Sequence, residues 1–424
     1  MKANNSNSKV FNFGCRLNAY ESEVIKSILT KNNLNNTLVV NTCAVTNEAE
    51  RQAQQTIRKL IKEYPNKKIV VTGCAAQICP EKYLAIEGVN SVIGNIEKLK
   101  NESWSNIEKK DVKNVSNIMN SNELNKNIVE KFDGKARAYV EIQQGCNHRC
   151  TFCIIPYGRG NNRSIPFGLI VERIKKLVSN GYKEIVLTGV DITDYGIDLP
   201  GKPRLTDIIK RLLKLIPELN QLRLSSIDCA ELNEDFFELV KSEERLMPHF
   251  HISLQSGDDM ILKRMKRRHN RKQSIEFCQK LKKIRPNILL GADLIAGFPT
   301  ETNIMFNNTC TLVKECDLTY LHVFPYSSRY STPASRMPQV PDFQKKLRAK
   351  KLRSLGEEQL HFHLKSSIGK QKTILIEKSF ENYSIGKTQE FSSIKVNEKL
   401  IEGKLYKLLV KSIDSNLYWL KHTQ

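Results

Sequence analysis

The sequence predicts an α/β protein with three folded parts: an N-terminal doubly wound parallel-sheet domain, a partial (β/α) barrel and a small C-terminal all-β barrel of the OB type. Strand-like and helix-like segments alternate in the first hundred positions and again in the middle of the chain, and short β runs replace them near the end. A chain of 424 residues has room for two to four domains. We expect domains at 1–99, 135–366 and 367–424, with a linker at 100–134.

The N-terminal part begins with three short apolar strands separated by helical patterns. We predict strands at 10–13, 38–40 and 69–71, with helices at 20–31 and 47–63. Because strand and helix alternate, the strands should be parallel. The following segment, 100–134, is polar and rich in Asn, so we interpret it as a linker with room for one strand.

Each of the three predicted strands leads into a cysteine: Cys15, Cys43 or Cys74, here called the N-terminal trio. The carboxyl ends of parallel strands lie along one edge of a sheet, so these thiols should be neighbours in space. The pattern predicts a metal site with three cysteine ligands. The alternative is that these are ordinary buried cysteines, which are common in protein cores.

The middle of the chain fits a partial (β/α) barrel. We predict strands at 138–143, 184–188, 221–225, 249–254, 288–295 and 319–323. Polar motifs follow several of them, namely TGVD, SSID, SLQSG and DLIAGFP. Functional sites of such barrels lie at the carboxyl ends of the strands.

The stretch QQGCNHRCTFCIIPYGRGNNR follows the first barrel strand and contains Cys146, Cys150 and Cys153, here called the loop trio. So dense a cysteine run in an intracellular chain indicates metal or iron–sulfur ligation rather than disulfides. Structural zinc sites and four-iron clusters usually have four protein ligands, so three imply an open metal position. The alternatives are a zinc knuckle completed by His148, or core cysteines.

The charge of the chain favours a polyanionic partner. There are 67 Lys and Arg residues against 45 Asp and Glu, a formal charge of +22, which attracts nucleic acid; the alternative is that lysine merely solubilises the surface. The run 263–272 has seven cations in ten positions and indicates either phosphate contact or a solvated face. The first ten residues lack a signal-peptide core, and no apolar run could span a membrane. We expect a cytoplasmic protein without membrane contact.

Both cysteine regions resemble those of a known family. The Cys-x-x-x-Cys-x-x-Cys spacing, with Phe152 beside the last cysteine, resembles the cluster loop of radical S-adenosylmethionine enzymes. FGCRLNAYESE, VVNTCAVTNEAER and VVTGCAAQ resemble the N-terminal domain of methylthiotransferases. The C-terminal β runs resemble the RNA-binding TRAM domain, so the resemblance extends over the whole chain.

The resemblance implies two [4Fe-4S] clusters and S-adenosyl-L-methionine as cofactors. The loop trio would hold the cluster that reduces S-adenosylmethionine, and the N-terminal trio the cluster that carries the inserted sulfur. Residues implied to contact S-adenosylmethionine are Phe152, Thr188, Gly189, Asp191, Ser225, Gln255 and Asp293. Many radical enzymes have Gly-Gly-Glu where this chain has Thr-Gly-Val-Asp. Arg159 and Arg163 are the predicted substrate-facing cations, with solvated loop residues as the alternative.

The opening motif GCRLNAYESE resembles the family branch that acts on N6-threonylcarbamoyladenosine in tRNA. The implied reaction is 2-methylthiolation at tRNA position 37. The same chemistry on isopentenyladenosine or on a ribosomal-protein aspartate stays open, as does a non-catalytic iron–sulfur RNA-binding protein. Ile165 stands where relatives often have Arg. We expect tRNA and an electron donor such as flavodoxin or ferredoxin as partners of a monomer.

Overall fold

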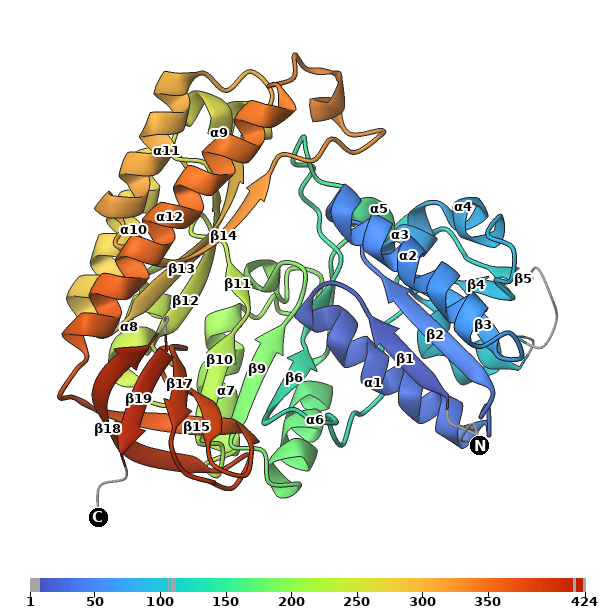
Figure 1. Cartoon of the computed structure of the whole chain (residues 1–424), viewed down its shortest axis with the longest axis horizontal. Coiled ribbons are helices and arrows are strands. Elements are labelled where there is room, and N and C mark those ends of the chain that lie inside the picture. The colour runs from blue at the N-terminus through green and yellow to red at the C-terminus, as the bar shows by residue number, and fades with distance from the viewer. Residues whose placement is uncertain (1–7, 106, 108–111, 415–416, 422–424) are drawn as a thin grey trace.

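The computed structural model describes residues 8–105, 107, 112–414 and 417–421, with side chains only as far as residue 413 at the C-terminal end. An N-terminal α/β unit lies beside a larger α/β core, and a small β barrel lies against the lower end of the core (Figure 1). The predicted fold class is confirmed. Within these residues, no helix is both long and apolar enough to cross a membrane.

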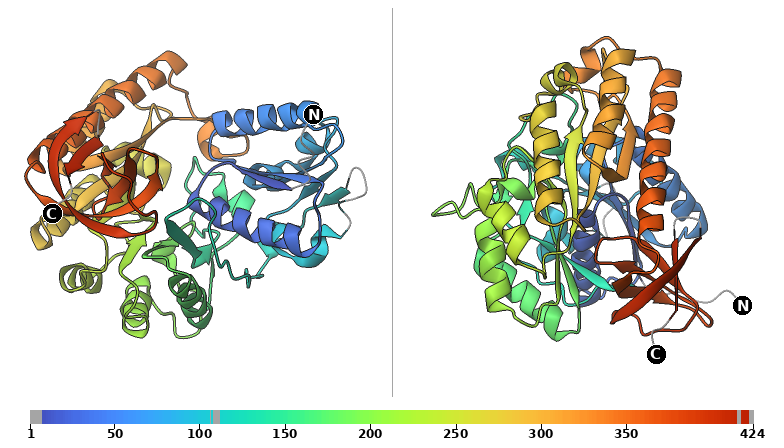
Figure 2. Two further views of the ribbon diagram at one scale, coloured as in Figure 1. Left: turned by 60° about the horizontal axis from the view of Figure 1, so that its bottom comes forward. Right: turned by 90° about the vertical axis from the view of Figure 1, so that its left-hand side faces the viewer.

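The N-terminal unit is a five-stranded parallel sheet whose strands follow one another in chain order. They are β1 (Lys9–Asn12), β2 (Thr37–Thr42), β3 (Lys68–Gly73), β4 (Ser91–Ile93) and β5 (Val112–Asn114). Helix α1 (Arg16–Lys31) packs on the face that carries Val39 and Val70, and α2 (Asn47–Glu63) packs on the opposite face. Helices therefore cover both faces, as Figure 2 shows.

The predicted linker, 100–134, contains the one strand for which the sequence left room. Strand β5 lies within 100–134, and it pairs with β4 to complete the N-terminal sheet. Its sequence, Val-Lys-Asn, is too short and polar to show a strand period. The rest of the segment is buried in places, with Trp104 and Ile118 almost fully covered. The chain between the two domains thus packs against both of them.

The core is a partial barrel made of two parallel sheets, β10-β9-β6 and β11-β12-β13-β14. The strands are β6 (Arg137–Glu141), β9 (Glu184–Thr188), β10 (Gln221–Leu224), β11 (Ser226–Ile227), β12 (His249–Gln255), β13 (Leu289–Ala296) and β14 (Leu318–Pro325). The barrel divides at Ser225, where β10 ends and β11 begins. A short hairpin of β7 (Gln143–Gln144) and β8 (Arg163–Ser164) frames the loop trio.

Helices alternate with the core strands and cover their outer side (Figure 1). They are α6 (Phe167–Ser179), α7 (Leu205–Leu215), α8 (Glu234–Ser242), α9 (Asp259–Met265), α10 (Arg271–Ile284) and α11 (Asn303–Glu315). The 25-residue helix α12 (Asp342–Ser366) then runs along the core to the C-terminal domain, where Leu364 joins the apolar interior of the barrel.

The C-terminal domain is a closed five-stranded barrel, in the order β15-β16-β17-β19-β18. Its strands are β15 (Gln371–Ser379), β16 (Ser384–Thr388), β17 (Ser393–Val396), β18 (Leu405–Asp414) and β19 (Leu417–Lys421). Phe391 belongs to the turn between β16 and β17, where it has a left-handed φ of 74°.

Candidate active site

The loop trio lies between β7 and the short helix α5 (Ile155–Arg159). Gly145 starts the loop with a φ of 69°, and a Cβ at this position would collide with the Asn161 carbonyl. The backbone N–H of Cys146 donates to the Gly160 carbonyl at 3.0 Å. Thr151 ties the middle of the loop to the end of α9, because its hydroxyl donates to the Arg264 carbonyl at 2.7 Å. The three thiols therefore stand on a loop that is fixed at both ends and in the middle.

A cavity of about 280 Å³ opens beside the loop trio at the carboxyl ends of the core strands. All three cysteines line it, together with Phe152, Asp191, Gln255 and Asp293 from the set predicted to contact S-adenosylmethionine. The N-terminal domain contributes Val45 and Thr46, which lie two and three residues after Cys43 of the N-terminal trio. The cavity thus lies between the two domains.

Three of the predicted contacts do not line this cavity: Thr188, Gly189 and Ser225. Their neighbours Val190 and Ser226 line it instead. The side chain of Gln143 is packed against this turn, since its Oε1 accepts hydrogen bonds from the backbone of Val190 and Asp191 at 2.9 Å. A Cβ on Gly189 would lie 2.7 Å from the same oxygen.

His148 is bound by carboxylates. Its Nε2 lies 2.8 Å from Asp194 Oδ2 and 3.2 Å from Asp191 Oδ2. Hydrogen bonds to Asp191 and then Asp194 raise the pKa of His148 to about 10. Among the described residues, Cys146, His148 and Asp191 have ligand atoms within 4.8 Å of one another, but no such group joins His148 to Cys150 and Cys153. The ligand set of the zinc-knuckle alternative is therefore not gathered in this structure.

Asp293 lines the cavity next to two histidines. His251 Nε2 lies 3.0 Å from its carboxylate and His322 Nδ1 lies 3.4 Å away. Burial opposes ionisation of Asp293, but the histidine contacts hold its pKa below the usual range. Gln255, at the end of the neighbouring strand β12, has a left-handed φ of 70°. Strained backbone at a non-glycine residue is typical of functional sites.

The N-terminal trio lies where the sequence predicted it, at the carboxyl ends of β1, β2 and β3. Cys43 is buried and Cys15 is exposed. A Cβ on Gly14, which has a φ of 104°, would lie 2.9 Å from Cys43 Sγ. Burial, and next the nearby Cys74, raise the pKa of Cys43 to about 12. Such a thiol becomes a ligand only when metal binding displaces its proton.

The sulfur atoms of neither trio are gathered as a single metal ion requires. Two sulfur atoms bound to one zinc at about 2.3 Å cannot be more than about 4.6 Å apart. Among the described residues, neither trio has its three sulfur atoms within 4.8 Å of one another. Three thiols would leave one iron of a four-iron cluster open to another ligand.

Arg159 does not face a substrate, in contrast to the prediction. Its side chain is only 2% exposed. Its Nε lies 3.1 Å from Cys74 Sγ, and its terminal nitrogens donate to Glu21 and Asn18 of α1. Arg159 therefore acts on the N-terminal trio. This contact joins residues 85 positions apart, so the sequence around Arg159 could not indicate it.

Arg163 is also buried rather than exposed to a substrate. Its terminal nitrogens donate to the carbonyls of Ser121 at 3.3 Å and Arg159 at 3.0 Å. It connects the segment between the domains to the end of α5. The substrate role predicted for Arg163 has no support in these contacts.

Two arginines of the basic run 263–272 are bound by carboxylates within the protein, while Lys263, Lys266 and Lys272 are exposed, so phosphate contact by this run stays a prediction. Arg267 donates to Asp228 at 2.7 Å and reaches Cys150 Sγ at 3.7 Å. Arg268 contacts Asp228 and Glu231. Sequence analysis missed Arg267 as a neighbour of the loop trio, although it belongs to a run that the composition singled out.

Helix α5 connects the two trios. It begins two residues after Cys153 and ends at Arg159, which contacts Cys74. Five residues of α-helix rise about 7.5 Å. The helix is pressed against the N-terminal domain, since a Cβ on Gly158 would lie 3.1 Å from the Cβ of Cys74. Asn95 also donates to the Gly158 carbonyl at 2.6 Å.

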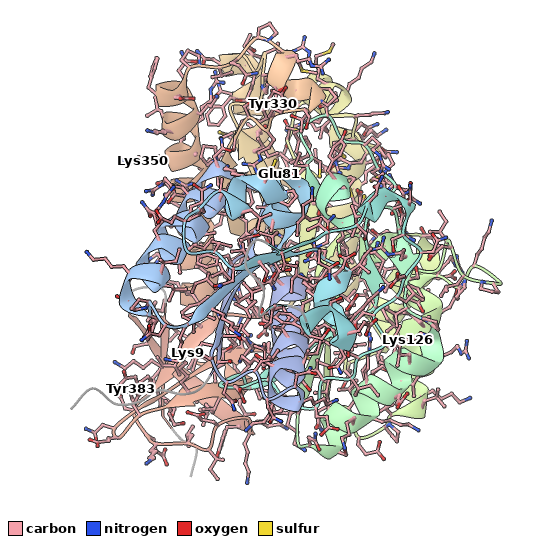
Figure 3. All side chains as sticks on the ribbon, turned by 90° about the vertical axis from the view of Figure 1, so that its right-hand side faces the viewer. Lys9, Glu81, Lys126, Tyr330, Lys350 and Tyr383 are labelled. Carbon is pink, nitrogen blue, oxygen red and sulfur yellow. The ribbon has the colours of Figure 1, made fainter. Side chains whose placement is uncertain are left out.

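A second contact between the domains lies at the mouth of the cavity. Arg329, on the loop after β14, binds Asn47 and Glu50 in the first turn of α2. The backbone N–H of Asn47 donates to Ser327 Oγ at 3.2 Å. In Figure 3 the next residue of this loop, Tyr330, lies above Glu81 of the N-terminal domain. The two domains are therefore joined on both sides of the cavity.

Two family descriptions match this chain: the Radical SAM superfamily at residues 140–313, and the uncharacterized protein family UPF0004 at residues 8–94. The threonylcarbamoyladenosine tRNA methylthiotransferase MtaB of Rickettsia prowazekii (strain Madrid E) is 53% identical over 97% of this chain and 96% of its own length. The protein of the same name from Bacillus subtilis (strain 168) is 33% identical, over 94% and 92%.

A tRNA-2-methylthio-N(6)-dimethylallyladenosine synthase of Clostridium botulinum (strain Loch Maree / Type A3) is also 33% identical, over 96% of this chain and 94% of its own length. Among solved structures, the radical S-adenosylmethionine methyltransferase TsrM from Kitasatospora setae matches with a TM-score of 0.55 at 15% identity, covering 74% of each chain. This last likeness shows the fold alone.

Proposed function

The chain belongs to the radical S-adenosylmethionine tRNA methylthiotransferases, and we propose that it adds a methylthio group to C2 of N6-threonylcarbamoyladenosine at position 37 of tRNA. The observation that carries this proposal is that the two cysteine trios lie at the two ends of the short helix α5. One trio lines the cavity, and the other lies at the opposite end of the helix. The opening motif GCRLNAYESE and the names of the most similar relatives support the threonylcarbamoyladenosine branch.

The loop trio and the N-terminal trio would each hold a [4Fe-4S] cluster. When bound, the clusters and S-adenosylmethionine supply the radical and the sulfur that substitution at an unactivated carbon requires. The protein's own contribution is ligation, orientation and exclusion of water. The thiols of Cys146 and Cys153, like that of Cys43, have pKa values raised to about 12 by burial, so they need metal to lose their protons.

The cavity lining fits an adenosyl cofactor. Phe152 packs edge-to-face on Phe298, with ring centroids 6.4 Å apart, and offers an apolar surface next to the loop trio. Asp191 and Asp293 provide carboxylates, and Gln255 provides an amide. Ile155, Val190, Ile227, Ile295 and Phe324 make the remaining wall largely apolar. Such a wall keeps water away from a reactive substrate carbon.

The formal charge of +22 supports encounter with tRNA, since phosphate attraction provides much of the affinity in protein–RNA contacts. The closed C-terminal barrel has the architecture of modules that bind single-stranded RNA. We expect the enzyme to act as a monomer in the cytoplasm, with an electron donor such as flavodoxin or ferredoxin.

Deletion of the gene tests this function directly. Digested tRNA from the deletion strain should retain N6-threonylcarbamoyladenosine and lack its 2-methylthio derivative when analysed by mass spectrometry. Complementation with the intact gene should restore the derivative. Persistence of the methylthio nucleoside would contradict the assignment, and loss of methylthio-isopentenyladenosine instead would move the chain to the other tRNA branch. Purified protein that binds iron but never cleaves S-adenosylmethionine would favour a non-catalytic role.

A further inference from the structure

Cys74 differs from the other members of the N-terminal trio in its contacts. Its sulfur lies 3.1 Å from Arg159 Nε, and Asn95 Nδ2 approaches the same sulfur at 3.7 Å. The thiol of Cys15 faces an acceptor instead, the Asn18 Oδ1 at 3.8 Å. The guanidinium of Arg159, a residue of the core domain, therefore forms its hydrogen bond to Cys74 and not to Cys15.

The network behind Arg159 is buried and carries excess positive charge. Glu21 receives hydrogen bonds from both Arg159 and Lys98, the latter at 2.7 Å. Glu21 and Lys98 are both 0% exposed. Two cations thus share one carboxylate in a site without solvent. A buried excess charge is costly unless a counter-charge compensates it.

A cluster held by the N-terminal trio would provide that counter-charge. Thiolate ligands and inorganic sulfide make such clusters anionic, and one-electron reduction adds a further negative charge. Hydrogen bonds to the sulfurs and nearby charges set the reduction potential of an iron–sulfur cluster. A cation in contact with a ligating sulfur stabilises the reduced form more than the oxidised form.

We propose that Arg159 is a positioning residue that raises the reduction potential of the cluster at the N-terminal trio, through its charged hydrogen bond to Cys74. The inference rests on the proposed function, because it assumes that this trio holds a cluster. It adds a specific role for an arginine of the core domain. Glu21 has the opposite effect, because its carboxylate partly neutralises Arg159.

The test isolates this cluster. Replacing all three cysteines of the loop trio by Ala leaves the N-terminal trio as the cluster site. This parent is reconstituted anaerobically, its iron and sulfide are measured, and its midpoint potential is determined by a spectroscopically monitored redox titration. Arg159→Gln, Glu21→Gln and Arg163→Gln are then compared in the same background. Arg163→Gln is the matched control, because Arg163 is a buried arginine four residues away without a contact to Cys74.

Arg159→Gln should shift the equilibrium between reduced and oxidised cluster about tenfold toward the oxidised form. For a one-electron couple this corresponds to a midpoint potential about 59 mV lower than that of the parent. Glu21→Gln should shift it in the opposite direction, and Arg163→Gln should leave it unchanged. Arg159→Lys, which keeps the charge, should recover part of the shift. Equal potentials for Arg159→Gln and the parent, or shifts of the same sign for Arg159→Gln and Glu21→Gln, would overturn the inference.

The iron content of the parent distinguishes a failure of the second cluster site from a failure of the role proposed for Arg159. A parent without iron would overturn both the second cluster site and the role of Arg159. An iron-loaded parent whose potential does not respond would overturn only the role of Arg159. If Arg159→Gln holds too little iron to titrate, the midpoint potential of Glu21→Gln tests the inference instead. A Glu21→Gln potential that is not higher than that of the parent would contradict the proposed charge effect.

Discussion

Phe391 is expected to anchor the C-terminal barrel to both other domains. Its ring is stacked on His249 of β12, with centroids 5.1 Å apart and planes at 21°. Four cations surround the ring, with centroid distances of 6.0, 5.2, 4.9 and 4.7 Å for Arg16, Arg137, Arg223 and Lys387 respectively. They come from α1, from two core strands and from the barrel itself. One aromatic turn residue thus contacts all three domains.

The perturbation is Phe391→Leu, which keeps an apolar side chain but removes the aromatic face. A cation over a ring contributes about 0.5–1 kcal/mol when exposed and about 2 kcal/mol when desolvated. Arg137 and Arg223 are buried, so the gross loss is about 5 kcal/mol. Because four cations share one ring, we expect a net loss of about 2–4 kcal/mol, which is about 30- to 1000-fold in the equilibrium for undocking.

Hydrogen exchange read by mass spectrometry measures this opening. The backbone N–H groups of Thr388 and Phe391 are hydrogen-bonded within the turn, and peptides that cover them should exchange about 30- to 1000-fold faster in Phe391→Leu. The control is Phe380→Leu, since Phe380 stacks on Tyr383 in the same barrel and is 41% exposed. Equal exchange in the two variants would show that the cations do not hold the barrel.

Three further outcomes are expected. Burial opposes ionisation of Glu184, but Arg223 and Arg137 hold its pKa down to about 2. This depressed pKa stabilises the fold by about 3 kcal/mol above pH 4.5, and that stability should be lost as the pH falls toward 2; urea unfolding of Glu184→Gln should lack this part of the pH dependence. Replacing the N-terminal trio by Ala should halve the iron and sulfide per chain, whereas retention of the full amount would refute the second cluster site. Gly14→Ala should also lower the iron content, because its Cβ would lie 2.9 Å from Cys43 Sγ, while Gly181→Ala, with a φ of 94° close to the 104° of Gly14 but nothing within 4 Å, should keep it.

Local patterns were sufficient to predict most strands of the two larger domains and the two long helices of the N-terminal domain. Helix α2 begins at Asn47, where the Thr46 side chain accepts a hydrogen bond from Ala49, and it ends just before Pro65. The continuous apolar run of β2 is buried along its whole length, as expected of a parallel strand covered on both faces. Because these signals are local, sequence alone placed the ends of the strands and therefore the N-terminal trio.

The missed features depend on contacts between distant segments. Strands β4 and β5 have three residues each, and their pairing is set by the edge that β3 leaves open. A positive charge in a loop sequence does not reveal whether it meets RNA, solvent or a buried carboxylate. Arg159 and Arg267 illustrate this, since each approaches a cysteine of one trio only after the chain has folded.

The contacts on the two sides of the cavity both depend on a buried arginine. On one side the side chains of Arg159 and Glu21 are 2% and 0% exposed, and breaking such a pair by removing one partner costs about 3–5 kcal/mol. On the other side the side chains of Arg329 and Glu50 are 8% and 17% exposed, so this ion pair is only slightly closer to solvent. The two domains are therefore held together on both sides of the cavity, and the contact between Arg159 and Cys74 links the loop trio's domain to the N-terminal trio.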